Sequence, residues 1–142
     1  MSHNSKNVDA SPLALIVEPN PQGHRLYYVG LLIDSCRDQG RSVRVLTTAV
    51  AVESVEWSVH LASKAPEVTL CLPQEFAYSS ILQAATDVAA SLTIVPDGDR
   101  YLIPILREGW SASGELALLV IRADGQPRDS PWLRQVLSLI HI

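Results

Sequence analysis

Apolar residues are arranged along this chain in two alternating ways, as short unbroken runs and as longer stretches with helical spacing. The first run is LALIV at residues 13–17, which no polar residue interrupts. Such a run is typical of a strand that is buried on both faces, as in a parallel sheet. A helical stripe follows over residues 25–38, and Gly40 would end that helix. The apolar positions of this stripe are Leu26, Val29, Ile33 and Cys36.

The same alternation continues along the rest of the chain. Further strands are predicted at residues 42–48, 67–72, 93–95 and 116–122. Helices are predicted at residues 52–63, 77–92 and 99–108, with another one beginning at Ser130-Pro131. Strands that alternate with helices indicate βαβ units with right-handed crossovers. The predicted fold class is α/β: a three-layer α/β/α Rossmann-like domain with a parallel sheet of about five strands in the order 3-2-1-4-5.

The chain divides into three segments by composition. Residues 1–11 (MSHNSKNVDAS) are polar and are expected to form a disordered tail, and residues 12–136 carry the Rossmann-like pattern. Residues 137–142 read LSLIHI, which resembles the conceptual translation of a transposon-end sequencing adapter, so we expect a non-native tail. The helix that begins at Pro131 would then be cut after about two turns, shorter than most helices. We therefore expect the natural protein to continue further.

Composition and charge narrow the function classes. With 142 residues, 47% hydrophobic and 18% charged, the chain has the size and composition of one globular domain. The net charge of -4, without a basic block, argues against a nucleic-acid partner.

The polar start has no secretory h-region, so we expect a cytoplasmic protein. Cys36 and Cys71 read as buried small hydrophobes outside any metal-ligand pattern. Neither GxGxxG nor a P-loop is present, so we expect no cofactor and no metal.

Two loops carry the most distinctive polar residues. In a sheet of the predicted order, ligands bind beyond the carboxyl ends of the strands where the strand order reverses. The loops PNPQGHR and PDGDR follow the first and fourth strands and would meet there. His24 could accept a proton, with Asp97 or Asp99 orienting its ring and stabilising the resulting cation. The alternative is structural: the His24 ring caps or packs at a turn, and Asp97 caps the next helix.

The stretch IVEPNPQGHRLYYVGLLIDSCRDQGRSVRVLTT resembles the start of a GT-B glycosyltransferase. The shared pattern is a first strand, P-x-x-GH, a helix with a bulky apolar face, and then G-x-x-V-x-V-L-T. The segment VPDGDRYL adds support, because transferases that use nucleotide sugars often place an acidic residue there. The resemblance extends over residues 13–136 and is most specific in the first stretch.

This resemblance implies the amino-terminal, acceptor-side half of an enzyme that moves a sugar from a nucleotide-sugar donor to an acceptor hydroxyl. In inverting members the histidine of this loop is the general base, which would be His24, and a later aspartate helps it, which would be Asp97 or Asp99. Retaining relatives have a glycine-rich loop that contacts the donor phosphates, a weaker match here. Retention or inversion stays open. The expected substrate contacts are Gly23, Asn20, Arg25 and Arg100.

The chain departs from the family in lacking the carboxyl-terminal domain that holds most donor contacts. We therefore expect that domain as a partner, and little donor binding or turnover by the chain alone. A lipid-linked acceptor would add peripheral contact with a membrane. The alternative function is a non-catalytic flavodoxin-like or receiver-like domain that binds partners. Phospho-relay is disfavoured because the first strand ends in one acid, Glu18, and the third in Leu72-Pro73-Gln74.

Overall fold

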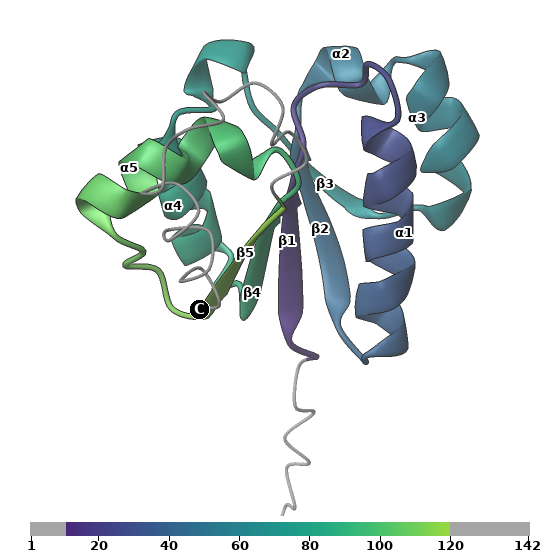
Figure 1. Ribbon diagram of the computed structural model, residues 1–142. Coiled ribbons are helices and arrows are strands. Elements are labelled where there is room, and N and C mark those ends of the chain that lie inside the picture. The colour runs from purple at the N-terminus through teal and green to yellow at the C-terminus, as the bar shows by residue number, and fades with distance from the viewer. Residues whose placement is uncertain (1–10, 120–142) are drawn as a thin grey trace, which may run out of the picture.

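A computed structural model describes residues 11–119 of the chain, and the sheet is its central feature. Five parallel strands lie in the order β3-β2-β1-β4-β5 (Figure 1). The predicted fold class and strand order are therefore confirmed. The strands are β1 (Leu13–Val17), β2 (Ser42–Thr47), β3 (Glu67–Leu70), β4 (Leu92–Val95) and β5 (Glu115–Leu118).

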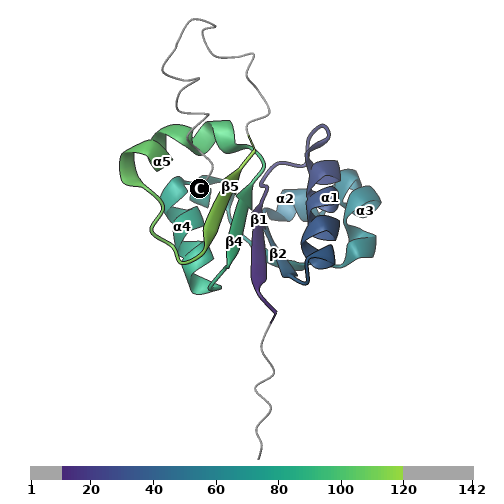
Figure 2. The ribbon, with the colours of Figure 1, turned by 60° about the horizontal axis from the view of Figure 1, so that its bottom comes forward.

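Helices cover both faces of the sheet and complete the three layers. On one face lie α1, α2 and α3, and on the other lie α4 and α5 (Figures 1 and 2). Their bounds are α1 (Arg25–Asp38), α2 (Ala49–Val52), α3 (Val55–His60), α4 (Tyr78–Asp87) and α5 (Leu102–Glu108). Short 3-10 turns are η1 (Ala62–Lys64), η2 (Pro73–Glu75) and η3 (Gly98–Tyr101).

Strand β1 connects the two halves of the hydrophobic core. Ala14 and Ile16 pack in the cluster beneath α1 and α3, whereas Leu15 and Val17 pack in the cluster beneath α4 and α5. All four side chains are at most 1% exposed. Successive residues of a strand point to opposite faces, so a strand with helices on both sides needs an unbroken apolar run. The expectation drawn from LALIV is confirmed.

The predicted single helix over residues 52–63 is wrong. The chain forms α2 and α3 there instead, each begun by a separate N-cap. The Thr48 side chain accepts a hydrogen bond from the Ala51 N–H at 3.2 Å, and the Ser54 side chain accepts one from the Trp57 N–H at 3.1 Å. A side-chain oxygen at the N-cap satisfies a free N–H of the first turn, and it favours a new helix start at that position.

Several other predicted boundaries shift by a few residues. The helix predicted at residues 99–108 begins as the 3-10 turn η3, and α5 itself starts at Leu102. The third strand ends at Leu70 rather than at residue 72, because the Leu72 N–H bonds the Glu75 carboxylate at 2.9 Å and the chain turns into η2. Helix α4 ends at Asp87, and Leu92 belongs to β4. The last predicted strand begins at Glu115 and is described to Leu118.

Several expectations fall outside the described residues. They concern residues 120–122, the helix at Ser130-Pro131, and the two tails at residues 1–10 and 137–142. Within residues 11–119, no helix combines the length and the apolar character that crossing a membrane would need.

The turn into β5 depends on a glycine, which gives a first testable prediction. Gly114 has φ +99, and a Cβ built on it would lie 2.3 Å from the Ala90 carbonyl oxygen. Gly114→Ala should therefore lower the free energy of unfolding by about 3 kcal/mol, from backbone strain and displacement of the chain at Ala90. Gly40 is a matched control, because its φ is +77 but no atom lies within 4 Å of the added Cβ.

Urea unfolding followed by circular dichroism measures both variants. Gly40→Ala should cost only about 1 kcal/mol, from the left-handed backbone alone. An equal decrease in the free energy of unfolding of the two variants would contradict the close approach between Gly114 and Ala90.

Candidate functional site

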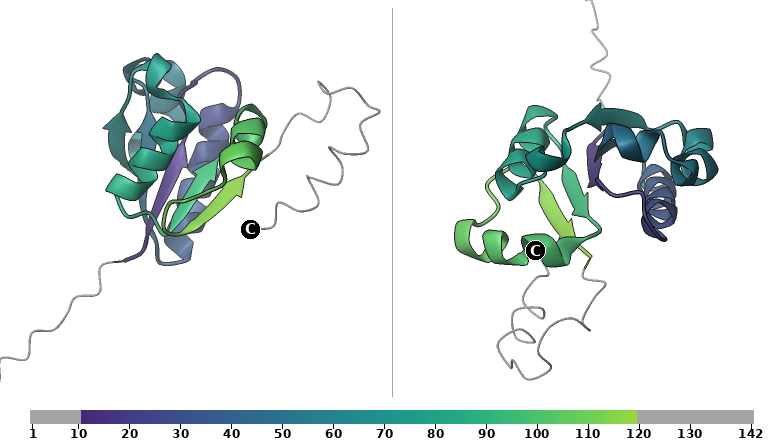
Figure 3. Two further views of the ribbon diagram at one scale, coloured as in Figure 1. Left: turned by 90° about the vertical axis from the view of Figure 1, so that its left-hand side faces the viewer. Right: turned by 90° about the horizontal axis from the view of Figure 1, so that it is seen from above.

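The loops after β1 and β4 meet at the carboxyl edge of the sheet. Strand β1 pairs with β2 on one side and with β4 on the other, so the strand order reverses at this edge. Figure 3 (right) looks down on it, with α1 to α3 and α4 to α5 on either side. The two loops enclose a cavity of about 330 Å³. Its lining residues are Glu18, Gln22, Gly23, His24, Arg25, Tyr28, Pro96 and Asp97.

Short-range hydrogen bonds shape the loop after β1. The Asn20 N–H donates to Glu18 Oε1 at 3.0 Å, and the Asn20 side-chain oxygen accepts from the Gln22 N–H at 2.9 Å. Gly23 then takes φ +68, a left-handed conformation that glycine adopts without strain. The chain enters α1 directly afterwards, with His24 at the N-cap position. Asn20 therefore supports the loop from within and is not among the residues that line the cavity.

Glu18 is the unexpected residue of this site. It follows β1 directly and is only 1% exposed. Its Oε1 lies 3.6 Å from Arg25 Nη1, and its buried Oε2 has no hydrogen-bond partner among the described residues. Burial raises the pKa of Glu18 above its ordinary value, although the hydrogen bond from Asn20 and the charge of Arg25 oppose this shift. A carboxyl group with an unsatisfied buried oxygen is costly, and it is typical of functional sites.

Arg25 joins the two loops. Its Nη1 donates to Asp97 Oδ2 at 2.8 Å and also faces Glu18, so one guanidinium group bridges acids that follow β1 and β4. The pKa of Arg25 is raised, chiefly by the hydrogen bond to Asp97. These interactions fix the relative position of the loops beneath the cavity.

His24 and Asp97 line the same cavity, as their positions in the sequence predicted, but they do not pair. The Asp97 carboxylate bonds Arg25, and the exposed ring of His24 has no hydrogen-bond partner among the described residues. The expected orientation of His24 by Asp97 is therefore not seen. The capping part of the structural alternative also fails, since neither side chain caps the helix that follows it.

Two other predicted residues lie away from the cavity. Asp99 is in η3 and is not among the lining residues. Arg100 is exposed and borders a separate hollow with Pro73, Tyr78 and Tyr101. Its expected role as a substrate contact of this site has no support in the geometry.

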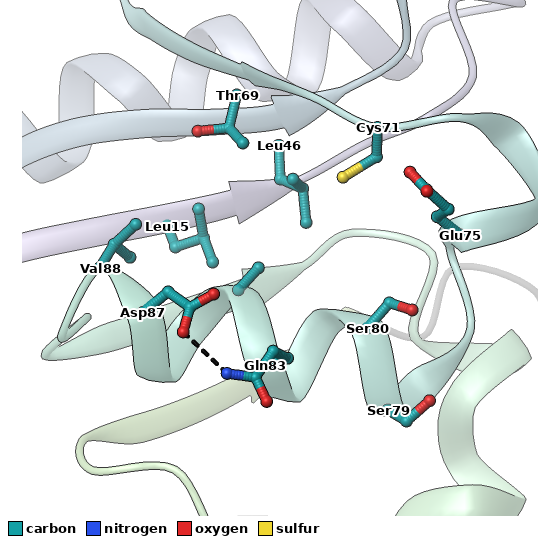
Figure 4. A pocket seen from close by; sticks show the side chains of 11 residues that line it. Leu15, Leu46, Thr69, Cys71, Glu75, Ser79, Ser80, Gln83, Asp87 and Val88 are labelled. Carbon is teal, nitrogen blue, oxygen red and sulfur yellow. Dashed lines mark hydrogen bonds between the residues drawn. The ribbon is translucent and has the colours of Figure 1, made fainter.

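A second and larger hollow of about 520 Å³ lies between α4 and the sheet. Figure 4 shows Cys71, Thr69 and Leu46 on the strand side, facing residues of α4. Gln83 donates a hydrogen bond to Asp87 at 2.7 Å, and the Glu75 carboxylate accepts one from the Leu72 N–H at 2.9 Å. Cys71 is half-buried rather than buried as expected, whereas Cys36 is buried. The hollow has no unpartnered buried polar atom, so the smaller cavity is the stronger candidate.

No protein-family model, curated protein or solved structure matches this chain. Within residues 11–119, no group of three or more histidine, cysteine or acidic side chains could hold a metal ion.

The raised pKa of Glu18 predicts a pH dependence of stability. A carboxyl group whose pKa is higher in the folded state binds its proton more tightly there, so its contribution is most favourable below the ordinary value of 4.5. That contribution is lost as pH rises through the folded-state pKa. The free energy of unfolding of the wild type relative to Glu18→Gln should therefore fall as the pH rises above the ordinary value of 4.5.

Chemical unfolding at several pH values checks this expectation. Glu53→Gln is the control, because Glu53 is exposed and lies at the end of α2. A constant difference between the wild type and Glu18→Gln as the pH rises above 4.5 would contradict the raised pKa.

Proposed function

We propose that this chain is the acceptor-side domain of a GT-B-type glycosyltransferase, and that the cavity between the loops after β1 and β4 receives the acceptor. The observation that carries the proposal is the position of His24. Its ring is exposed, without a hydrogen-bond partner among the described residues, and borders a cavity where the strand order reverses. Such edges of open α/β sheets are the usual place for ligands.

The reaction follows from the basicity of the imidazole ring. The His24 imidazole takes the proton of the acceptor hydroxyl as the hydroxyl oxygen attacks the anomeric carbon of the nucleotide sugar. The bond to the nucleoside diphosphate breaks, and the diphosphate leaves with the electron pair. A direct displacement of this kind inverts the anomeric carbon. Asp97 takes a supporting part, because its carboxylate holds Arg25 and thereby the loop that carries His24.

Donor binding is assigned to a second, carboxyl-terminal domain. The lining of the cavity has one guanidinium group, Arg25, and this group is already engaged by Asp97 and Glu18. Phosphates need uncommitted cations or free backbone N–H groups, so this lining offers them little. A cytoplasmic location, and membrane contact through a lipid-linked acceptor, stay predictions from the sequence.

A non-catalytic partner-binding domain is the second candidate function. Large apolar side chains on the outer surface of α1 and α3 favour it. Their exposed fractions are 46% for Tyr27, 49% for Leu31, 74% for Val55 and 65% for Val59.

A sugar-transfer assay separates the two candidates. The natural gene product that contains residues 11–119 is incubated with uridine and guanosine diphosphate sugars and with hydroxylated acceptors. Mass spectrometry then detects the glycosylated acceptor, and release of the nucleoside diphosphate is measured in parallel. We expect transfer with at least one pair of donor and acceptor.

One outcome would contradict the glycosyltransferase proposal. That outcome is no transfer with any of these donors and acceptors by a gene product that has no second nucleotide-binding domain, and it would favour the partner-binding role.

A further inference from the structure

Only one of the two oxygens of the Glu18 carboxyl group has a partner among the described residues. Its Oε1 accepts a hydrogen bond from the Asn20 N–H and faces Arg25, whereas Oε2 is buried and has no partner among the described residues. Glu18 is 1% exposed and belongs to the lining of the 330 Å³ cavity. A buried polar oxygen without a partner is costly unless a ligand satisfies it.

The charges around the cavity limit which ligand can do so. One cation, Arg25, faces two carboxylates, Glu18 and Asp97, so the lining carries a net negative charge when all three are ionised. An anionic group such as phosphate would meet repulsion from two carboxylates and no uncommitted guanidinium. A neutral hydroxyl meets neither problem, and it can donate a hydrogen bond to the free oxygen.

The rest of the lining suits a molecule rich in hydroxyl groups. The Gln22 amide can donate and accept, and Tyr28 offers a half-exposed aromatic ring (43%) against which a ring of C–H groups can pack. Gln22 and His24 are exposed, and no described residue hydrogen-bonds their side chains, so they can turn aside as a ligand hydroxyl approaches Glu18.

We propose that Glu18 positions the acceptor by taking a hydrogen bond from one of its hydroxyl groups at Oε2, and that the cavity selects a neutral, hydroxyl-rich acceptor over a phosphate-bearing one. The inference rests on the proposed function, because it names the substrate class of the same cavity. Glu18 is a positioning and specificity residue, and His24 remains the proton acceptor.

Titration of the 142-residue chain by nuclear magnetic resonance tests this proposal. The probes are methyl glucoside and inositol as neutral polyols, inorganic phosphate as the anion, and glucosamine as the cation. We expect a neutral polyol to shift the backbone amides of residues 20–28 and 96–98, and phosphate to leave them in place. Glu18→Gln should weaken polyol binding about tenfold or more, because the amide donates where the ligand also donates.

Two further variants keep the test decisive. Glu18→Asp keeps the charge but withdraws the carboxylate by one methylene group, so it should weaken binding as well. Glu53→Gln makes the same change as Glu18→Gln at an exposed position and should bind as the wild type does. The proposal is overturned if Glu18→Gln binds as tightly as the wild type, if phosphate or glucosamine binds and the polyols do not, or if no probe shifts these amides.

The failure of this inference can be told apart from failure of the proposed function. Polyol binding that depends on Glu18, in a gene product that transfers no sugar, would keep the inference and remove the glycosyltransferase proposal. Sugar transfer that requires His24, with the same acceptor KM in Glu18→Gln as in the wild type, would keep the glycosyltransferase proposal and remove this inference. In an active enzyme we expect Glu18→Gln to raise the acceptor KM about tenfold, with a smaller change in kcat.

Discussion

Replacing Arg25 with methionine should lower the free energy of unfolding by about 3 kcal/mol. The guanidinium group lies 2.8 Å from Asp97 and 3.6 Å from Glu18 Oε1, and Glu18 is almost fully buried. Methionine keeps much of the length of the side chain but removes the charge. Glu18 would then be buried without its salt-bridge partner, and loss of one member of a buried pair costs far more than loss of a surface pair.

Urea unfolding of three variants measures this loss of stability and shows whether it comes from the pairing of Arg25 with Glu18. Arg107→Met makes the same change at an exposed position of α5 and should alter stability by no more than about 0.5 kcal/mol. The double variant Glu18→Gln and Arg25→Met should recover part of the loss, since no carboxylate is then buried without a cation. A loss in Arg25→Met no larger than that in Arg107→Met would contradict the bridging role of Arg25.

The Arg25 pairing matters for function because it connects the two loops of the site. Arg25 follows His24 at the start of α1, and Asp97 follows β4. The pairing therefore holds the His24 loop against the β4 loop before any ligand arrives. Groups that are fixed in advance lose less entropy when a ligand binds.

The elements nearest the site were predictable from the sequence because their patterns are strong. The bounds of β1 and α1 agree with the predicted residues 13–17 and 25–38. An unbroken apolar run ending at Glu18-Pro19, followed by a regular helical stripe, leaves few alternatives. The strand order followed from the alternation of strands and helices, and it placed the loops after β1 and β4 at one edge.

The details of the site were less predictable because they depend on long-range contacts. Arg25 and Asp97 are 72 residues apart in the chain, and no local pattern shows that they pair with each other rather than with His24. In the sequence, Glu18 stands out only as an acid at the end of a strand. The available signal was its position directly after a run that is buried on both faces, which predicts burial of the next side chain too.

Local capping explains the boundary that was missed. The apolar spacing of residues 52–63 suggested one helix, but Thr48 and Ser54 each begin a separate one. Polar N-caps at both positions were visible in the sequence, and they outweighed the apolar periodicity.

The measurement that tests the central claim most directly is the sugar-transfer rate of His24→Ala in the natural gene product. If His24 takes the proton of the acceptor hydroxyl, kcat should fall about a hundredfold to ten-thousandfold. His60→Ala is the matched control, because His60 lies on α3 beside the ring of Tyr27 and does not line the cavity. We expect near-normal turnover from His60→Ala and unchanged melting temperatures in both variants. Near-normal turnover by His24→Ala would contradict its role as the general base.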